Sequence, residues 1–242
     1  MTLLTTELHP VPGRAVIVFA ADRRVTRGTS RSSDQKKVMW VPSIRVGIGF
    51  FGLAEVPTSA GRQPMTDWLQ DFLYTVRPDE TVAVFAHRLA GALNAAVPVD
   101  WRNEASGFHV AGFGAEGSPE FWFVRNVDDS RQPSLGRYEA REDFHRRDRH
   151  TLPVGAHQIY RNGDIRAHIT AWERLDKAFG TLLTQPDFRP IVTTRDYVDW
   201  VQFKLEMVAD FYERYCSESI IGRPIDSFAF SPSEYEASTM VV

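Results

Sequence analysis

The sequence predicts an α+β fold, a four-layer αββα sandwich in which two sheets lie between two layers of helices. Alternating or wholly apolar runs indicate strands within residues 2–51, 107–126 and 225–230. Apolar residues at helical spacing indicate one pair of helices within residues 64–96 and a second pair within residues 166–217. Helix pairs that interrupt the strands in this order can bury their apolar stripes by covering the outer faces of a double sheet.

The N-terminal region is predicted to begin with a strand at residues 2–8, followed by a proline-rich turn at residues 9–14. The run 15–21, AVIVFAA, is apolar at every position, which indicates a strand buried on both faces. Residues 22–36 are rich in Ser, Thr and Arg, and they are predicted to form a loop.

Two hairpins are predicted from paired apolar runs that flank turn residues. The first joins residues 37–41 to residues 44–51, and the second joins residues 107–114 to residues 119–126. A last strand, residues 225–230, completes the set of strands.

Four helices are predicted, at residues 64–76, 79–96, 166–183 and 195–217. Asp79 is the candidate N-cap of the second helix, because a short polar side chain there can accept from the first free N–H groups. The last helix is predicted to turn six side chains inward: Tyr197, Trp200, Val201, Leu205, Val208 and Phe211.

The domain organisation is predicted to be simple, with one domain at residues 1–230 and a polar tail at residues 231–242. The net charge of −3 gives no bulk attraction for nucleic acid or for a membrane surface. The basic run 145–150 is flanked by acidic residues, so a solvated loop of mixed charge is expected there. No apolar stretch reaches the length of a membrane span, and no leader peptide is evident.

The sequence contains no signal for a metal site, a cofactor site or a disulfide. The seven histidines contain no His-x-x-x-His pair, so no zinc site is predicted. The glycine-rich segment 107–117 lacks the Lys and helix of a phosphate loop. Cys216 is the single cysteine and is expected to be a small buried or half-buried residue. One cysteine cannot form an internal disulfide, which favours a reducing, cytoplasmic location.

Three short segments carry the chemistry: Ala20–Thr26 (AADRRVT), Lys36–Val38 (KKV) and Phe50–Glu55 (FFGLAE). In this order and spacing they resemble the opening of proteasome β subunits and of the bacterial HslV-type peptidases, which are N-terminal-nucleophile hydrolases. The resemblance is strongest over residues 15–55, and elsewhere it is mainly one of element order.

The resemblance implies a role for each matching residue. Thr2 takes the position of the nucleophile once Met1 is removed, Asp22 that of the orienting acid, Lys37 that of the lysine, and Gly52 that of the oxyanion N–H donor. A threonine hydroxyl is a weak nucleophile that needs a base, and a free α-amine with a pKa near 8 can serve. A lysine ammonium lowers the pKa of both groups, and a buried aspartate keeps that lysine charged.

Thr6 is an alternative nucleophile, because it lies sixteen residues before Asp22, which is the spacing of the family. Its use would require cleavage after Thr5 and would place Pro10 in the first hairpin, where a missing N–H weakens the ladder. Thr2 needs only a first turn that is longer by about four residues, so Thr2 is preferred.

The second half of the site matches the family less well. Asp164 and Glu218 are the nearest matches to its later polar residues, and Ile221 stands where the family has a serine. A second hypothesis therefore stays open, a ring protein of the same fold without peptidase activity that serves as a scaffold or binding chamber. A third, less favoured, is another N-terminal-nucleophile hydrolase that acts on small amides.

The partners follow from the resemblance alone. It implies assembly of identical subunits into stacked rings of six or seven, polypeptide substrates, and an ATP-dependent unfoldase that feeds the chamber. No cofactor, no nucleic acid and no membrane partner is expected.

Overall fold

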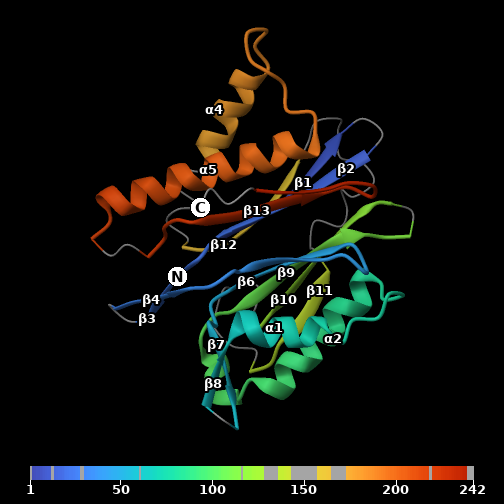
Figure 1. The fold of residues 1–242 in the computed structure, drawn as a ribbon, viewed down its shortest axis with the longest axis vertical. Coiled ribbons are helices and arrows are strands. Elements are labelled where there is room, and N and C mark those ends of the chain that lie inside the picture. The colour runs from blue at the N-terminus through green and yellow to red at the C-terminus, as the bar shows by residue number, and fades with distance from the viewer. Residues whose placement is uncertain are drawn as a thin grey trace. The chain divides into compact units, whose positions relative to one another are not determined.

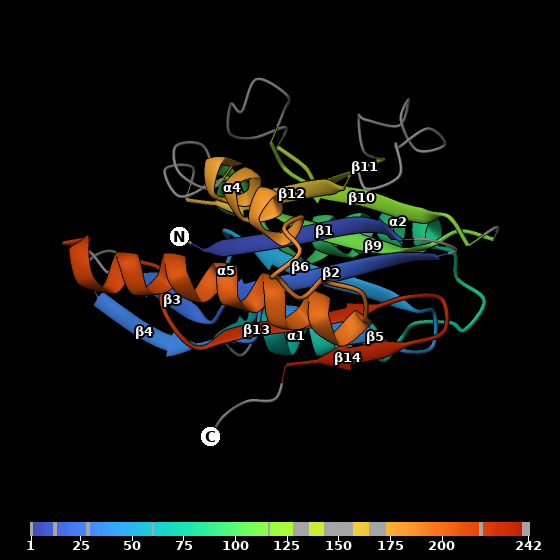
Figure 2. The same ribbon diagram turned by 90° about the horizontal axis from the view of Figure 1, so that it is seen from above.

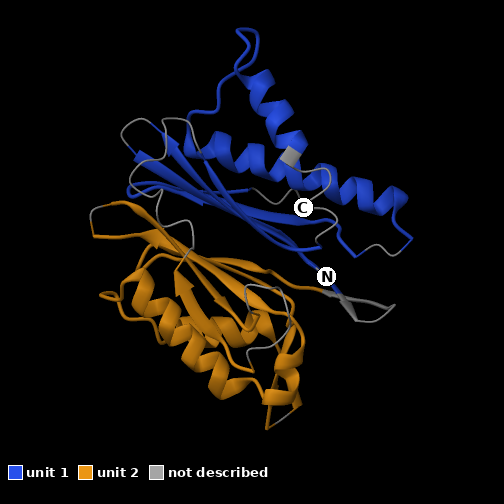
Figure 3. Cartoon of the chain, turned by 180° about the vertical axis from the view of Figure 1, so that it is seen from behind, with its two compact units in different colours: residues 1–33, 157–242 blue, residues 34–156 orange. Residues whose placement is uncertain are grey.

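The structure is a computed structural model, and it describes residues 2–11, 14–27, 30–59, 61–115, 117–127, 136–142, 157–164, 173–217 and 220–238. It is a mixed α+β structure with antiparallel sheets, which confirms the predicted class. The chain divides into two compact units, residues 1–33 with 157–242 and residues 34–156 (Figure 3).

The first unit is a five-stranded sheet with two helices on one face (Figure 1). The order of its strands is β12 (Gln158–Gly163), β1 (Leu3–Val11), β2 (Arg14–Asp22), β13 (Ile225–Phe230) and β14 (Tyr235–Ala237). The apolar run predicted to be doubly buried is β2, which lies at the centre of this sheet and is buried from Val16 to Asp22.

The helices of this unit are α4 (Glu173–Leu183) and α5 (Thr194–Tyr215). Helix α5 packs on β2 and β13, and Figure 2 shows it running along these strands with α4 toward β12. Its inward side chains join those of β2 in one apolar core, which includes Val16, Val18, Val198, Val201 and Leu205.

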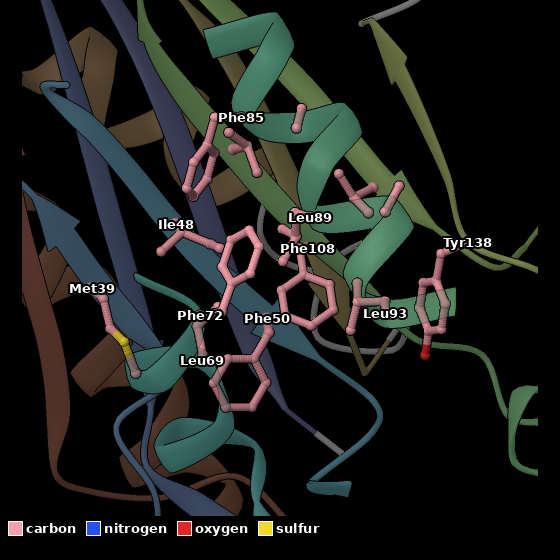
Figure 4. Close-up of a cluster of buried hydrophobic side chains, with 14 of the residues drawn as sticks. Met39, Ile48, Phe50, Leu69, Phe72, Phe85, Leu89, Leu93, Phe108 and Tyr138 are labelled. Carbon is pink, nitrogen blue, oxygen red and sulfur yellow. The ribbon is translucent and has the colours of Figure 1, made fainter. Parts of the chain in front are cut away.

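The second unit contains the sheet β11 (Glu139–Glu142), β10 (Pro119–Arg125), β9 (Gly107–Phe113), β6 (Val46–Phe51) and β5 (Val38–Val41). Helices α1 (Met65–Leu73) and α2 (Val82–Ala96) pack on one face of it (Figure 1). Figure 4 shows the core between them, where Phe50 and Phe108 of the sheet meet Phe72, Phe85 and Leu89 of the helices. A short hairpin, β7 (Glu55–Thr58) with β8 (Gly61–Pro64), precedes α1.

The predicted turn at residues 9–14 is too long, because β1 continues to Val11 and pairs there with Arg14. The ladder between β1 and β12 ends at Leu8, so Pro10 needs no N–H for a bond to that neighbour. The predicted loop at residues 22–36 is also wrong in part, since β3 (Arg24–Arg27) and β4 (Ser30–Asp34) form a small hairpin. That segment lacks the alternating apolar residues that indicate a half-buried strand.

Three helix and tail predictions need correction. Thr81, not Asp79, caps α2, and its side chain accepts from the backbone N–H of Val84 at 3.2 Å. Phe211 is 61% exposed, whereas Tyr212, one position later, is buried in the core. Residues 235–237 of the predicted tail form β14, which pairs with β13.

Candidate functional site

Thr2 lies just before the first residue of β1, at the end of the sheet where β2 finishes, and only 6% of it is exposed. The register of β1 and β2 places Leu4 opposite Ala21, so the next residues outward are Leu3 and Asp22. The backbone N–H of Leu3 donates to Oδ1 of Asp22 at 2.8 Å. The predicted acid is therefore fully buried and bonded to the residue that directly follows the predicted nucleophile.

Asp164 reaches Thr2 from the other neighbouring strand. It follows the last residue of β12, and its backbone N–H donates to the carbonyl oxygen of Thr2 at 3.1 Å. Gly163, the residue before it, has φ = +116°, and any Cβ there would collide with the Thr2 carbonyl group. Glycine at 163 thus permits the close approach of the two backbones.

The carboxylate of Asp164 is buried and has a partner that the sequence prediction missed. The hydroxyl of Tyr212 on α5 donates to Oδ2 of Asp164 at 3.1 Å. The prediction assigned the inward position to Phe211, and this error of one residue in helical phase concealed Tyr212.

Lys37 and Gly52 belong to the unit of residues 34–156. Lys37 is buried just before β5, and its carbonyl accepts from the backbone N–H of Phe50 at 3.0 Å. Gly52 follows β6 with φ = +85°, in the left-handed region that favours glycine. These two predicted residues therefore lie just beyond the ends of the adjacent strands β5 and β6, near the same end of one sheet.

Glu218 lies outside the described residues. Ile221, which stands where the family has a serine, is fully buried in the apolar core beneath α5. Its carbonyl oxygen accepts from Nη1 of Arg24 at 2.9 Å, while its side chain offers no polar atom. The structure thus brings Thr2, Asp22 and Asp164 together in one unit, and it supplies no hydroxyl at position 221.

Two arginines after Asp22 tie the end of β2 to neighbouring elements. Arg23 donates through Nε and Nη2 to both carboxylate oxygens of Asp226, at 2.7 and 2.6 Å. Arg24 donates to Glu213 of α5 at 2.9 Å. Sequence reasoning missed these pairs, although two arginines directly after a buried strand were a signal that carboxylate partners are nearby.

A second cluster of titratable groups lies between β1 and the helices of the same unit. Glu7 bonds to Lys204 of α5 and to His9, and Lys204 also bonds to Asp176 of α4. Burial is the largest cause that lowers the pKa of His157, whose ring stacks on His9. Lys204 bonds to two carboxylates, and one of them, Glu7, also bonds to His9, so these groups form an internal ion network.

A scan against models of known protein families finds no match for the chain, and a search of curated proteins also finds none. Among the described residues, no group of three or more His, Cys, Asp or Glu side chains is arranged to hold a metal ion. None of the helices in the described segments has the length and apolar character needed to traverse a bilayer. The candidate site is therefore the group of buried residues around Thr2.

Proposed function

We propose that the chain is a threonine-type peptidase subunit of a cytoplasmic, self-compartmentalising ring complex. In this proposal Thr2 becomes the N-terminal residue when Met1 is removed, and it attacks the carbonyl groups of peptide substrates. The proposal includes a four-layer αββα arrangement of the two helix-covered sheets and homo-oligomeric rings of six or seven subunits, fed by an ATP-dependent unfoldase.

The observation that carries the proposal is the bond from Leu3 N–H to the Asp22 carboxylate. This bond supports Thr2 as the nucleophile, because it holds Asp22 beside the residue that follows Thr2. Thr6 is less suitable, because it is fully buried within β1, opposite Phe19 of β2 and Tyr160 of β12. Cleavage before Thr6 would remove the first three residues of β1, Leu3 to Thr5, together with their pairing to both neighbouring strands.

The proposed chemistry uses the α-amine and the side-chain hydroxyl of Thr2. Its α-amine, freed by loss of Met1, accepts the proton of the hydroxyl as Oγ1 attacks the carbonyl carbon. Lys37 lowers the pKa of these groups while Asp22 balances the lysine charge, and the N–H of Gly52 stabilises the oxyanion. The protonated amine then gives its proton to the leaving amine, and water hydrolyses the ester. Asp164 and Glu218 act around the amine as polar supports.

The experiment that tests the proposal is covalent labelling followed by peptide mapping. A peptide electrophile directed at N-terminal threonines should add one equivalent to the parent, on a peptide that begins at Thr2. Thr2→Ala should abolish both the adduct and the cleavage of a fluorogenic peptide amide. Thr6→Val, which keeps the shape of the side chain, is the matched control and should retain both. Labelling at Thr6, or full activity in Thr2→Ala, would overturn the proposal.

The second candidate function, a ring protein without peptidase activity, is favoured by one observation. Ile221 is buried and apolar at the position where the resemblance calls for a hydroxyl. Intact-mass measurement separates the two functions, because a chain that keeps Met1 has no free Thr2 amine. Rings seen by native mass spectrometry, together with retained Met1 and no adduct, would favour the inactive scaffold.

A further inference from the structure

The turn at Gly52 rests directly on another loop of the same unit. A Cβ placed on Gly52 would lie 2.7 Å from both Cα and Cβ of Ser106, and still closer to the carbonyl oxygen of Ala105. These contacts leave no room for a side chain, so the Gly52 backbone packs against the peptide that joins Ala105 to Ser106. The position of Ser106 therefore limits the positions that the Gly52 peptide can take.

Ser106 is held by Asn126, which bonds to several groups of its loop. The backbone N–H of Ser106 donates to Oδ1 of Asn126 at 2.9 Å, and its carbonyl accepts from Asn126 N–H at 3.2 Å. The Nδ2 group of Asn126 donates to the carbonyls of Arg102 and Glu104, at 2.9 and 2.8 Å. Asn126 is fully buried, so water cannot replace these bonds.

The side chain of Ser106 is held by Tyr138. Its Oγ lies 2.6 Å from the hydroxyl oxygen of Tyr138, and both side chains are 2% exposed or less. Burial is the main reason that the pKa of Tyr138 is raised, so the phenol stays protonated and can donate or accept in this bond. The backbone of Tyr138 is in turn fixed by Asn94 of α2, which both accepts from its N–H and donates to its carbonyl.

Arg102 is the last member of the network. Its guanidinium donates to the carbonyl oxygens of Asn94, Val97 and Gly136, at distances between 2.6 and 2.9 Å. The network thus draws on α2, the short 3-10 helix η1 (Val99–Asn103), and the residues next to β9, β10 and β11, and its members are Asn94, Arg102, Ser106, Asn126 and Tyr138. Buried networks in which each member is bonded are stiff, because movement of any one group leaves a polar atom unpaired.

We propose that Ser106, Asn126 and Tyr138 are positioning residues that hold the peptide beneath Gly52 and so fix the direction of its N–H toward the oxyanion. The inference rests on the proposed function, since the Gly52 N–H serves as an oxyanion donor in that reaction. Donors in an oxyanion hole act through preorganisation, and small displacements from the productive geometry lose much of the rate. None of the three residues touches the substrate in this proposal, so none is a catalytic residue.

The test uses the full-length protein with Tyr138→Phe and Ser106→Ala, which each remove one hydroxyl of the buried pair. We expect kcat for a fluorogenic peptide amide to fall by roughly tenfold to a hundredfold, while KM changes by less than about threefold. Hydrogen exchange followed by mass spectrometry should show faster exchange in peptides that span residues 50–56. The kcat of the double variant should be close to that of the less active single variant, because both substitutions remove the same hydrogen bond.

Thr81→Ala is the control for a general loss of stability, because it removes the cap of α2 in the same unit without touching the Ser106 loop. It should leave kcat and the exchange at residues 50–56 unchanged. Unchanged exchange and unchanged kcat in both hydroxyl variants of an active parent would overturn the positioning role. A parent that cleaves no peptide would instead overturn the proposed function, and with it any role of Ser106, Asn126 and Tyr138 in catalysis. Exchange at residues 50–56 would still decide whether these residues hold the Gly52 turn.

Discussion

The ammonium group of Lys204 on α5 lies 2.7 Å from Oε1 and 3.0 Å from Oε2 of Glu7, at the centre of β1. Both side chains are at most 3% exposed, so this pair is a buried salt bridge between helix and sheet. Asp176 of α4 also accepts from Lys204 at 3.0 Å, and it pairs with Arg161 on β12. The pair therefore joins α4 and α5 to the first strand, which begins beside Thr2.

Lys204→Met is expected to lower the free energy of unfolding by about 3–5 kcal/mol, because it leaves the Glu7 carboxylate buried without its cation. Asp176 keeps Arg161 as a partner, so most of the lost free energy of unfolding comes from the unpaired Glu7 carboxylate. Adding Glu7→Gln to Lys204→Met should recover much of this loss, since the uncompensated charge is removed. Urea unfolding followed by circular dichroism measures each value.

The control for this prediction is an exposed ion pair on the same helix. Arg195 and Asp199 lie 2.9 Å apart and both are largely exposed. Asp199→Asn should change the free energy of unfolding by less than about 1 kcal/mol. Equal losses in Asp199→Asn and Lys204→Met would contradict a special role of burial.

The same pair predicts how stability depends on pH. Burial alone would raise the pKa of Glu7, but Lys204 and the hydrogen bond with His9 hold it well below its ordinary value. The unfolded chain binds a proton at Glu7 near pH 4.3, whereas the folded chain resists it. The stability contributed by this carboxylate is thus present at neutral pH and is lost as the pH falls below about 5.

Urea midpoints measured between pH 7 and pH 3.5 check this pH dependence. Glu7→Gln has no carboxylate at this site, so its midpoint should fall less steeply with acidity than that of the parent. Parallel curves of urea midpoint against pH for the two proteins would show that other carboxylates account for the loss of stability at low pH.

The fold could be predicted where a single local signal was strong. The apolar run of β2 and the apolar stripes of α1, α2 and α5 identified these elements, because burial imposes a period on the residues concerned. The hairpins β3–β4 and β7–β8 were missed, since both are short and polar and carry no such period. Strand order was equally hidden, because the neighbours of β1 and β2 include strands from the other end of the chain.

Within the candidate site, only the environment of Asp22 was predictable from the sequence. Asp22 follows seven apolar residues, so a buried charge with a partner could be expected from local sequence alone. The bonds of Tyr212 to Asp164 and of Asn126 to Ser106 join residues far apart in the chain, and nothing near either residue signals them. Lys204 breaks the apolar stripe of α5, and that break was the one local sign of the buried ion network.

Gly52→Ala is expected to destabilise the protein by about 2 kcal/mol or more, because alanine is strained at φ = +85° and its Cβ meets the Ser106 loop. Gly91→Ala in α2 is the matched control, since a Cβ there meets nothing within 4 Å. It should stabilise the protein by roughly 0.5–1 kcal/mol through helix propensity. Thermal or urea unfolding of the two variants compares them directly, and equal effects would exclude a special conformation at Gly52.

Two substitutions separate the structural role of Asp22 from its role in the proposed reaction. Asp22→Asn keeps an oxygen that accepts from Leu3 N–H, so its free energy of unfolding should stay within about 1 kcal/mol of the parent. Asp22→Ala leaves that buried N–H unbonded and should cost about 1–3 kcal/mol. If Asp22 balances the charge of the predicted catalytic lysine, both variants should lose at least roughly a hundredfold in kcat. Urea unfolding and peptide cleavage measured on the same preparations distinguish the two parts. An Asp22→Asn variant that is stable and fully active would assign Asp22 to the fold alone, and the proposed mechanism would then lack its orienting acid.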